Sequence, residues 1–181
     1  MSNYRRVKEG RTYFFTVVTY QRRPFLCQDG SRLALRTAIE ETRLSHPFEI
    51  DAWVLMPDHL HCIWTLPDND GDYSKRWGLI KAGFTKKIKS DVAGNVQKSN
   101  SRTKHRESIV WQRRFWEHMI RNEADYKAHI DYIHFNPVKH GLVGAPAEWK
   151  HSTFHKCVQE GMYTIEWGAT GDLPFADIGN E

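Results

Sequence analysis

The feature that most constrains this chain is a pair of neighbouring strand-like segments, residues 48–56 and 59–66. In the first segment apolar residues occupy every second position, the period of a strand with one buried face. The second segment has the composition of a strand and follows directly after the turn-forming dipeptide Pro57-Asp58. The two segments are therefore predicted to pair as an antiparallel hairpin.

The second segment carries two histidines, His59 and His61, separated by one apolar residue. Alternate side chains of an extended chain share a face, so the two imidazoles project together while Leu60 and Cys62 point into the opposite layer. Two imidazoles at this spacing can bind one divalent ion. An isolated His-x-His pair is more often a pair of half-buried sheet histidines, so a metal site needs a further ligand.

A candidate third ligand, Asn136, lies in a predicted helix downstream. Tyr132 precedes it by four residues, which places the two side chains on one helix face, and Pro137 places Asn136 close to the helix end. Two imidazoles, an amide oxygen and a phenol form a phosphoryl-transfer centre if the metal holds a phosphate oxygen and the tyrosine attacks phosphorus. Tyr132 could equally be a core aromatic.

At these residues the sequence resembles the REP-associated tyrosine transposases. These are IS200-like transposases within the His-hydrophobic-His single-strand DNA endonucleases. The resemblance covers nearly the whole chain in order, and it is carried by residues 4–6, 12–19, 57–64, 111–118, 131–141 and 152–155. It implies a catalytic Tyr132, metal ligands His59 and His61, and Asn136 as the third ligand, a position where relatives often carry Gln.

Length and composition are those of one globular domain spanning residues 1–181. Hydrophobic residues make up 40% of the chain and aromatic residues 13%, enough for its own core despite 27% charged residues. Three cysteines without paired short spacing argue against a disulfide framework and against a Cys-rich zinc site. No signal peptide or membrane span is recognisable. A cytoplasmic, nucleoid-associated protein is expected.

The charge is unevenly distributed along the chain. Residues 1–156 hold all 26 basic side chains and 17 of the 22 acidic ones, a net charge of +9 that is typical of a polyanion binder. The remaining five acids lie in a C-terminal tail, residues 160–181, which could compete with DNA or simply aid solubility. Residues 94–108 are poor in hydrophobic side chains and are predicted to form a mobile loop.

The order of predicted elements is strand, helix, strand, strand, helix, strand, helix. This order is typical of an α+β ferredoxin-like sandwich, an antiparallel four- to five-stranded sheet with packed helices. The resemblance implies the same fold. The strand carrying His59 and His61 would then face the helix carrying Tyr132, although the sequence alone does not establish that they meet.

Three of these predicted elements have recognisable boundaries. Ser74 could cap the second helix, whose apolar stripe is Trp77, Ile80, Phe84 and Ile88. Residues 111–120 alternate enough to form the fourth strand. Asn122, with Asp125 three residues on, is a capping-box-like start for the helix carrying Tyr132.

Several basic and aromatic side chains are candidates for holding DNA. Arginine can read guanine edges, and bases can stack on Tyr or Trp. The candidates are Tyr4, Arg5, Arg6, Arg22, Arg23, Lys81 and Lys86. The resemblance implies a substrate of the REP/BIME class, imperfect palindromes that form hairpins with a short single-stranded foot. A monomer is favoured, with the oligomeric state left open.

The function expected from these features is single-strand DNA cleavage and strand transfer through a covalent 5′-phosphotyrosine, with Mg²⁺ or Mn²⁺ as cofactor. Two alternatives remain open. One is a metal-dependent nuclease in which water attacks and Tyr132 is structural. The other is a noncatalytic nucleic-acid-binding regulator, which would bind DNA without any metal requirement.

Overall fold

The computed structural model describes residues 7–8, 10–92 and 108–169. These residues form a four-stranded antiparallel sheet with strand order β2-β3-β1-β4. The strands are β1 (Thr12–Val18), β2 (Glu49–Leu55), β3 (His59–Thr65) and β4 (Trp116–Met119). The predicted hairpin is present, since β2 and β3 pair antiparallel across the turn at Pro57-Asp58.

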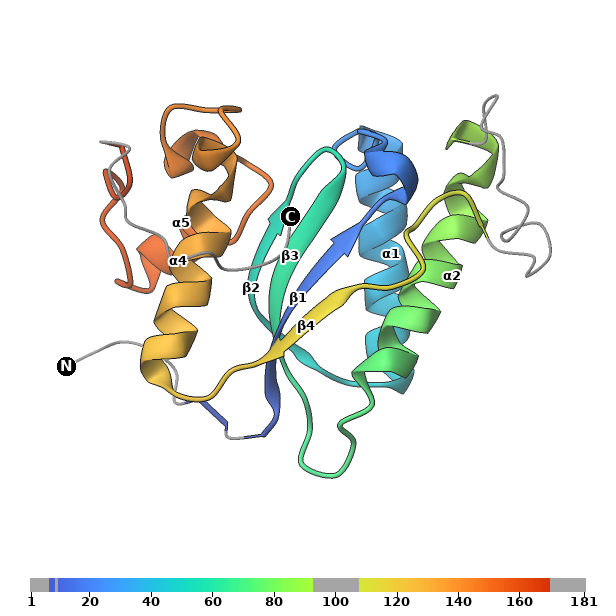
Figure 1. The fold of residues 1–181 in the computed structure, drawn as a ribbon, viewed down its shortest axis with the longest axis horizontal. Helices are drawn as coiled ribbons and strands as arrows, with labels where there is room; N and C mark the ends of the chain where they lie inside the picture. Colours follow the sequence, from blue (N-terminus) through green and yellow to red (C-terminus); the bar gives the residue numbers. More distant parts are fainter. Residues whose placement is uncertain (1–6, 9, 93–107, 170–181) are drawn as a thin grey trace.

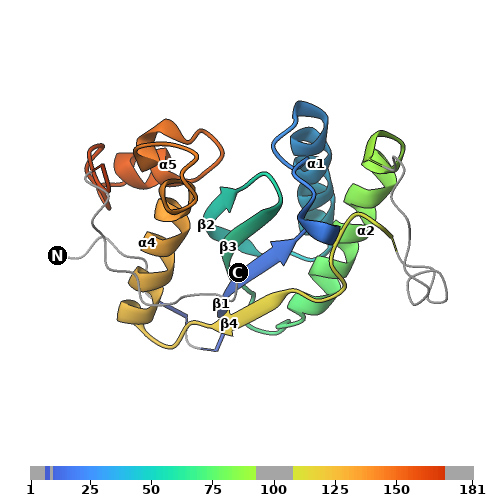
Figure 2. The same cartoon turned by 45° about the horizontal axis from the view of Figure 1, so that its top comes forward.

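Helices cover both faces of the sheet, as Figures 1 and 2 show. Helices α1 and α2 pack side by side on one face, and α4 lies on the other face with α5 beside it. The helices are α1 (Asp29–Ser45), α2 (Tyr73–Val92), α4 (Glu123–Lys139) and α5 (Phe154–Gln159), with short 3-10 turns η1 (Tyr20–Arg22) and η2 (Pro146–Glu148). The molecule is thus a three-layer helix–sheet–helix sandwich.

The strict alternation of the central strands divides the core into two clusters. In β3, Leu60 and Trp64 point toward α1 and α2, where Trp77 stacks on Trp64 with 4.2 Å between ring centroids. Ile63 points the other way and packs, with Phe14 of β1, beneath α4. His59 and His61 share the face of Ile63 because residues two apart in a strand point the same way. The side chains of both histidines therefore point from β3 toward α4.

The predicted ferredoxin-like fold is confirmed, including the apolar stripe of α2, but two boundaries were wrong. The fourth strand was predicted to span residues 111–120. Trp111 makes only an isolated bridge with Thr19, and regular pairing with β1 resumes at Trp116. The Tyr132 helix was predicted to end near Asn136. It continues to Lys139, because Pro137 lacks only one N–H and the helix bonds on either side of it persist.

Side chains at two helix starts satisfy backbone donors. Asn122 caps α4 by accepting from the N–H of Asp125, as its sequence predicted. Helix α2 was expected to begin with Ser74 as cap, but Asp72 takes that role by accepting from the N–H of Lys75. The acidic loop before α2 is also structural, since Asp70 binds the fully buried Arg76 through two hydrogen bonds.

Part of the acidic C-terminal segment packs on the body of the protein. Trp167 lies against Tyr163 and Phe154, at 4.5 and 6.1 Å between ring centroids. Residues 170–181 of the predicted tail, residues 4–6 and residues 94–107 of the predicted mobile loop lie outside the described residues. None of the described helices has both the length and the apolar character needed to cross a membrane.

Candidate active site

The candidate site lies between β3 and α4. His59 and His61 are almost fully buried, at 1% and 0% exposure, and their rings lie 4.9 Å apart at an angle of 74°. The ring of Tyr132, on α4, lies 5.2 Å from that of His61. Phe14 of β1 packs against both His61 and Tyr132 and closes the site on the side of β1. The fold thus brings together the histidine pair and the tyrosine from segments about 70 residues apart.

Both histidines are oriented through the same ring atom. Nδ1 of His59 lies 2.6 Å from a carboxylate oxygen of Asp58, and Nδ1 of His61 lies 2.8 Å from the hydroxyl of Thr16. Arg22 in turn binds the second oxygen of Asp58 at 3.1 Å. Burial opposes ionisation of Asp58, but the hydrogen bonds and charges of His59 and Arg22 outweigh it and lower the pKa of its carboxyl. A carboxylate on Nδ1 of a histidine is the usual partner of a metal ligand that binds through Nε2.

The residues present fit a divalent metal. Nε2 of His59 is buried and has no hydrogen-bond partner among the described residues. A buried ring nitrogen without a partner costs free energy unless a ligand fills that role. Because Asp58 fixes Nδ1 as the donor, Nε2 presents a lone pair to the site. Imidazole nitrogen with amide oxygen is a donor set that Mn²⁺ accepts and Mg²⁺ tolerates.

The candidate third ligand, Asn136, lies on α4 one turn after Tyr132 and is fully buried. Its spacing from Tyr132 places both side chains on one helix face, as the sequence predicted. The structure adds His140, directly after α4, whose ring lies 5.3 Å from that of His59. Sequence reasoning gave His140 no role, and the only available signal was its place four residues after Asn136.

The candidate nucleophile has a cationic neighbour that sequence reasoning also missed. Nζ of Lys139 lies 3.5 Å from the hydroxyl oxygen of Tyr132 and 4.8 Å from the centre of its ring. Lys139 is the last residue of α4, seven residues after Tyr132, so two helical turns bring the side chains together. Tyr132 itself is only 1% exposed, and it therefore also serves as a core aromatic.

Two of the proposed DNA-binding side chains, Arg22 and Lys81, bind protein groups in the structure. Arg22 binds Asp58, and Gln21 and Arg22 both adopt left-handed backbone conformations, with φ of 56° and 50°. That conformation is costly for residues other than glycine, and here it aims Arg22 at the carboxylate that orients His59. Lys81 on α2 donates to the carbonyl of Gln112, whereas Lys86 is exposed. Tyr4, Arg5 and Arg6 lie outside the described residues.

Comparison with known proteins agrees with this fold. The family described as "Transposase IS200 like" matches residues 8–136. The chain belongs to this family of IS200-like transposases. It is 46% identical over 174 residues to the REP-associated tyrosine transposase of Escherichia coli strain K12, covering 96% of this chain and 93% of that protein.

A solved structure is also similar over the full length of both chains. It is described as a REP-associated tyrosine transposase bound to a REP hairpin, and it shares 42% sequence identity with this chain at a TM-score of 0.72. The predicted enzyme class, a tyrosine transposase, is confirmed by these relatives.

Proposed function

We propose that this protein is a metal-dependent single-strand DNA endonuclease and strand transferase that acts on REP-type hairpins through a covalent bond to Tyr132. The observation that carries the proposal is the contact between the histidine pair and the tyrosine, with His61 and Tyr132 rings 5.2 Å apart. A nucleophile beside a pair of metal-type ligands is the arrangement that in-line attack on phosphorus needs. The hairpin substrate is suggested by the solved relative, which is bound to a REP hairpin.

The reaction conserves bonds and protons. The hydroxyl oxygen of Tyr132 attacks the scissile phosphorus, and the bond from phosphorus to the 3′ oxygen breaks. The phenol loses its proton to solvent, and the departing 3′ oxygen takes one up. The products are a 5′-phosphotyrosine and a free 3′-hydroxyl. Because the new ester replaces an ester of similar energy, the hydroxyl of another DNA end can reverse the step without a nucleotide cofactor.

His59, His61 and Asn136 would hold Mg²⁺ or Mn²⁺ in this proposal. A bound divalent ion supplies Lewis-acid polarisation of the scissile phosphate and stabilises the negative charge of the transition state. Asp58 and Thr16 hold the two imidazoles in their orientations. The surrounding apolar side chains, Phe14 among them, exclude water from these groups and so strengthen their interactions with charge.

Lys139 is proposed as a positioning residue for the nucleophile. Its ammonium group lies 3.5 Å from the Tyr132 oxygen and donates a hydrogen bond to it, which fixes the direction of the hydroxyl. Since Tyr132 is only 1% exposed, the side chains around its oxygen have to shift when a scissile phosphate enters.

The DNA partner is proposed to be a hairpin with a single-stranded foot. Lys86, Arg23 and the N-terminal residues Tyr4, Arg5 and Arg6 remain candidates for direct phosphate or base contact. In the structure the guanidinium carbon of Arg23 lies 5.5 Å from the ring centre of Phe25, a contact that DNA binding would have to tolerate or replace. Arg22 and Lys81 would have to exchange the protein partners they have in the structure for DNA. We propose that the protein acts as a monomer in the cytoplasm, where the nucleoid DNA lies.

The proposal is tested by incubating labelled REP hairpin with the protein and Mn²⁺, then separating the products under denaturing conditions. The wild type is expected to give a protein–DNA band that survives denaturation and that chelation abolishes. His59→Ala and His61→Ala should lose the band but keep hairpin affinity, because phosphate contacts dominate binding. Cleavage without any covalent band would favour the water-dependent nuclease. Hairpin binding without cleavage at any metal concentration would favour the noncatalytic regulator.

A further inference from the structure

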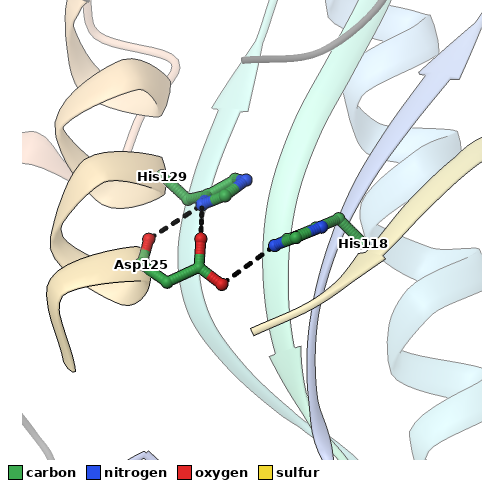
Figure 3. A group of neighbouring side chains, drawn as sticks. All are labelled: His118, Asp125 and His129. Carbon is green, nitrogen blue, oxygen red and sulfur yellow. Dashed lines mark hydrogen bonds and ion pairs between the residues drawn. The ribbon is translucent and has the colours of Figure 1, made fainter. Parts of the chain in front are cut away.

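A second cluster of metal-type ligands lies outside the candidate active site. Figure 3 shows His118 of β4 beside Asp125 and His129, which stand one turn apart in α4. Nε2 of His118 lies 2.9 Å from one carboxylate oxygen of Asp125, and Nδ1 of His129 lies 3.1 Å from the other. The two imidazole rings stack, with 4.6 Å between centroids and 12° between planes. The two carboxylate oxygens of Asp125 thus bridge one nitrogen of each ring, and the two rings come from different elements.

The spacing of these groups suits a single divalent ion. Their ligand atoms all lie within 4.8 Å of one another. Ligand atoms bound to one ion at about 2.0–2.2 Å are separated by roughly 3 to 3.5 Å, so only small side-chain adjustments are needed. Two histidines and one carboxylate are a set that binds divalent transition metals and leaves positions open for water. His118 and Asp125 keep 19% exposure each, which gives water that access.

Neighbouring groups hold the Asp125 carboxylate in place. The backbone N–H of Arg121 donates to the Asp125 carboxylate at 2.9 Å. The backbone N–H of Asp125 donates to the side-chain oxygen of Asn122, also at 2.9 Å. Burial opposes ionisation of Asp125, but the bonds from Arg121 and His118 outweigh it and lower its pKa. Burial also lowers the pKa of His129. An ionised carboxylate and neutral imidazole are the protonation states that metals require.

The cluster is separate from the His59–His61 pair. The ring of Phe14 lies between the two groups, 4.9 Å from the ring of His129 and 5.5 Å from that of His61. Without a metal, the same groups form hydrogen bonds, including one from His129 Nδ1 to the carbonyl of Asp125 at 2.8 Å. If the cluster is purely structural, these hydrogen bonds are its whole function. If it is a metal site, an added ion displaces them.

We propose that His118, Asp125 and His129 form a second site for a divalent transition metal such as Zn²⁺. On binding, the ion replaces the two histidine–carboxylate hydrogen bonds and the bond from His129 Nδ1 to the carbonyl of Asp125, and the proton on each coordinating nitrogen leaves for the other ring nitrogen or for solvent. The site joins the edge strand β4 to the first two turns of α4. Because α4 also carries Tyr132, the ion would fix the helix that presents the nucleophile without touching DNA itself.

The test uses the full chain carrying His59→Ala and His61→Ala, freed of metal and titrated with Co²⁺ in the absence of DNA. We expect one equivalent of Co²⁺ to bind with visible d–d absorption and to be displaced by Zn²⁺. Adding Asp125→Asn or His118→Gln to this chain should weaken binding at least about tenfold, the size expected for loss of a ligand. His155→Gln, at an exposed histidine in α5, is the matched control and should leave binding unchanged.

Absence of Co²⁺ binding in the His59→Ala/His61→Ala chain would overturn the proposal. So would binding that both Asp125→Asn and His118→Gln leave intact. Thermal unfolding gives a second measurement that does not depend on the spectrum. Zn²⁺ should raise the melting temperature of the His59→Ala/His61→Ala chain, and Asp125→Asn should remove that rise; an equal rise in both chains would contradict the site. Since no DNA is present, failure here leaves the proposed strand cleavage unaffected.

Discussion

At the scale of single residues, the proposed third ligand can be tested by the chemistry of its side chain. Asn136→Asp keeps an oxygen donor that a hard cation accepts, whereas Asn136→Ala leaves only a methyl group. We therefore expect the aspartate variant to cleave hairpin DNA faster than the alanine variant, with both below the wild type. Single-turnover cleavage in Mn²⁺ measures this order. Equal rates for the alanine variant and the wild type would remove Asn136 from the metal site.

Lys139 gives a second prediction at this scale. Lys139→Gln should slow cleavage at saturating DNA by roughly 5- to 10-fold, because a partly exposed charge beside the phenol contributes about 1 kcal/mol. Lys139→Arg should recover most of that rate. Lys156→Gln, at an exposed position of α5, removes the same charge away from Tyr132 and should leave the rate near that of the wild type. A loss confined to hairpin affinity in Lys139→Gln would assign the residue to DNA binding instead.

At the scale of elements, Thr153 adds a hydrogen-bonded link between α4 and β2, which also pack through apolar side chains. The hydroxyl of Thr153 accepts from the N–H of Trp53 at 2.9 Å and lies 2.9 Å from Nε2 of His134. Burial lowers the pKa of His134 to about 3, so the ring stays neutral. Thr153→Val would leave both partners without this hydroxyl and should destabilise the fold by about 1–3 kcal/mol in denaturant unfolding. Thr37→Val, whose hydroxyl bonds to an exposed turn of α1, should cost less than about 0.5 kcal/mol.

The same scale shows what the sequence could predict. The β2–β3 hairpin followed from period-two alternation and a two-residue turn, both local properties of the chain. The length of β4 could not be predicted in the same way. Gln112 makes a single backbone hydrogen bond to Val18, and regular pairing with β1 begins only at Trp116, although both segments alternate in sequence. The residues of the candidate site, His59, His61 and Tyr132, were proposed from the sequence, and the structure places them side by side. Their meeting is tertiary, because β3 and α4 are distant in the chain. The contacts of Asp58 with His59 and of Lys139 with Tyr132 are local, but which side-chain atoms meet depends on the orientation that the tertiary packing gives each ring.

At the scale of the whole molecule, the charge division between body and tail yields a prediction. Removing residues 170–181 deletes Asp172, Asp177 and Glu181 but keeps Trp167, which packs on Tyr163. If the tail competes with DNA for the basic body, this truncation should raise hairpin affinity, and most clearly at low salt where attraction is least screened. Titrations of both chains across a salt series measure the effect. Unchanged affinity at every salt concentration would leave the tail without an inhibitory role.

The central claim is that Tyr132 becomes covalently bonded to DNA, and the most direct measurement is to locate that bond. Wild-type protein is incubated with REP hairpin and Mn²⁺, denatured, digested with a protease and a nuclease, and the modified peptide is sequenced by mass spectrometry. The account predicts a nucleotide attached through its 5′ phosphate to Tyr132, and no modified peptide from Tyr132→Phe, which keeps the ring but lacks the oxygen. A nucleotide on any other residue, or strand cleavage by Tyr132→Phe, would contradict it.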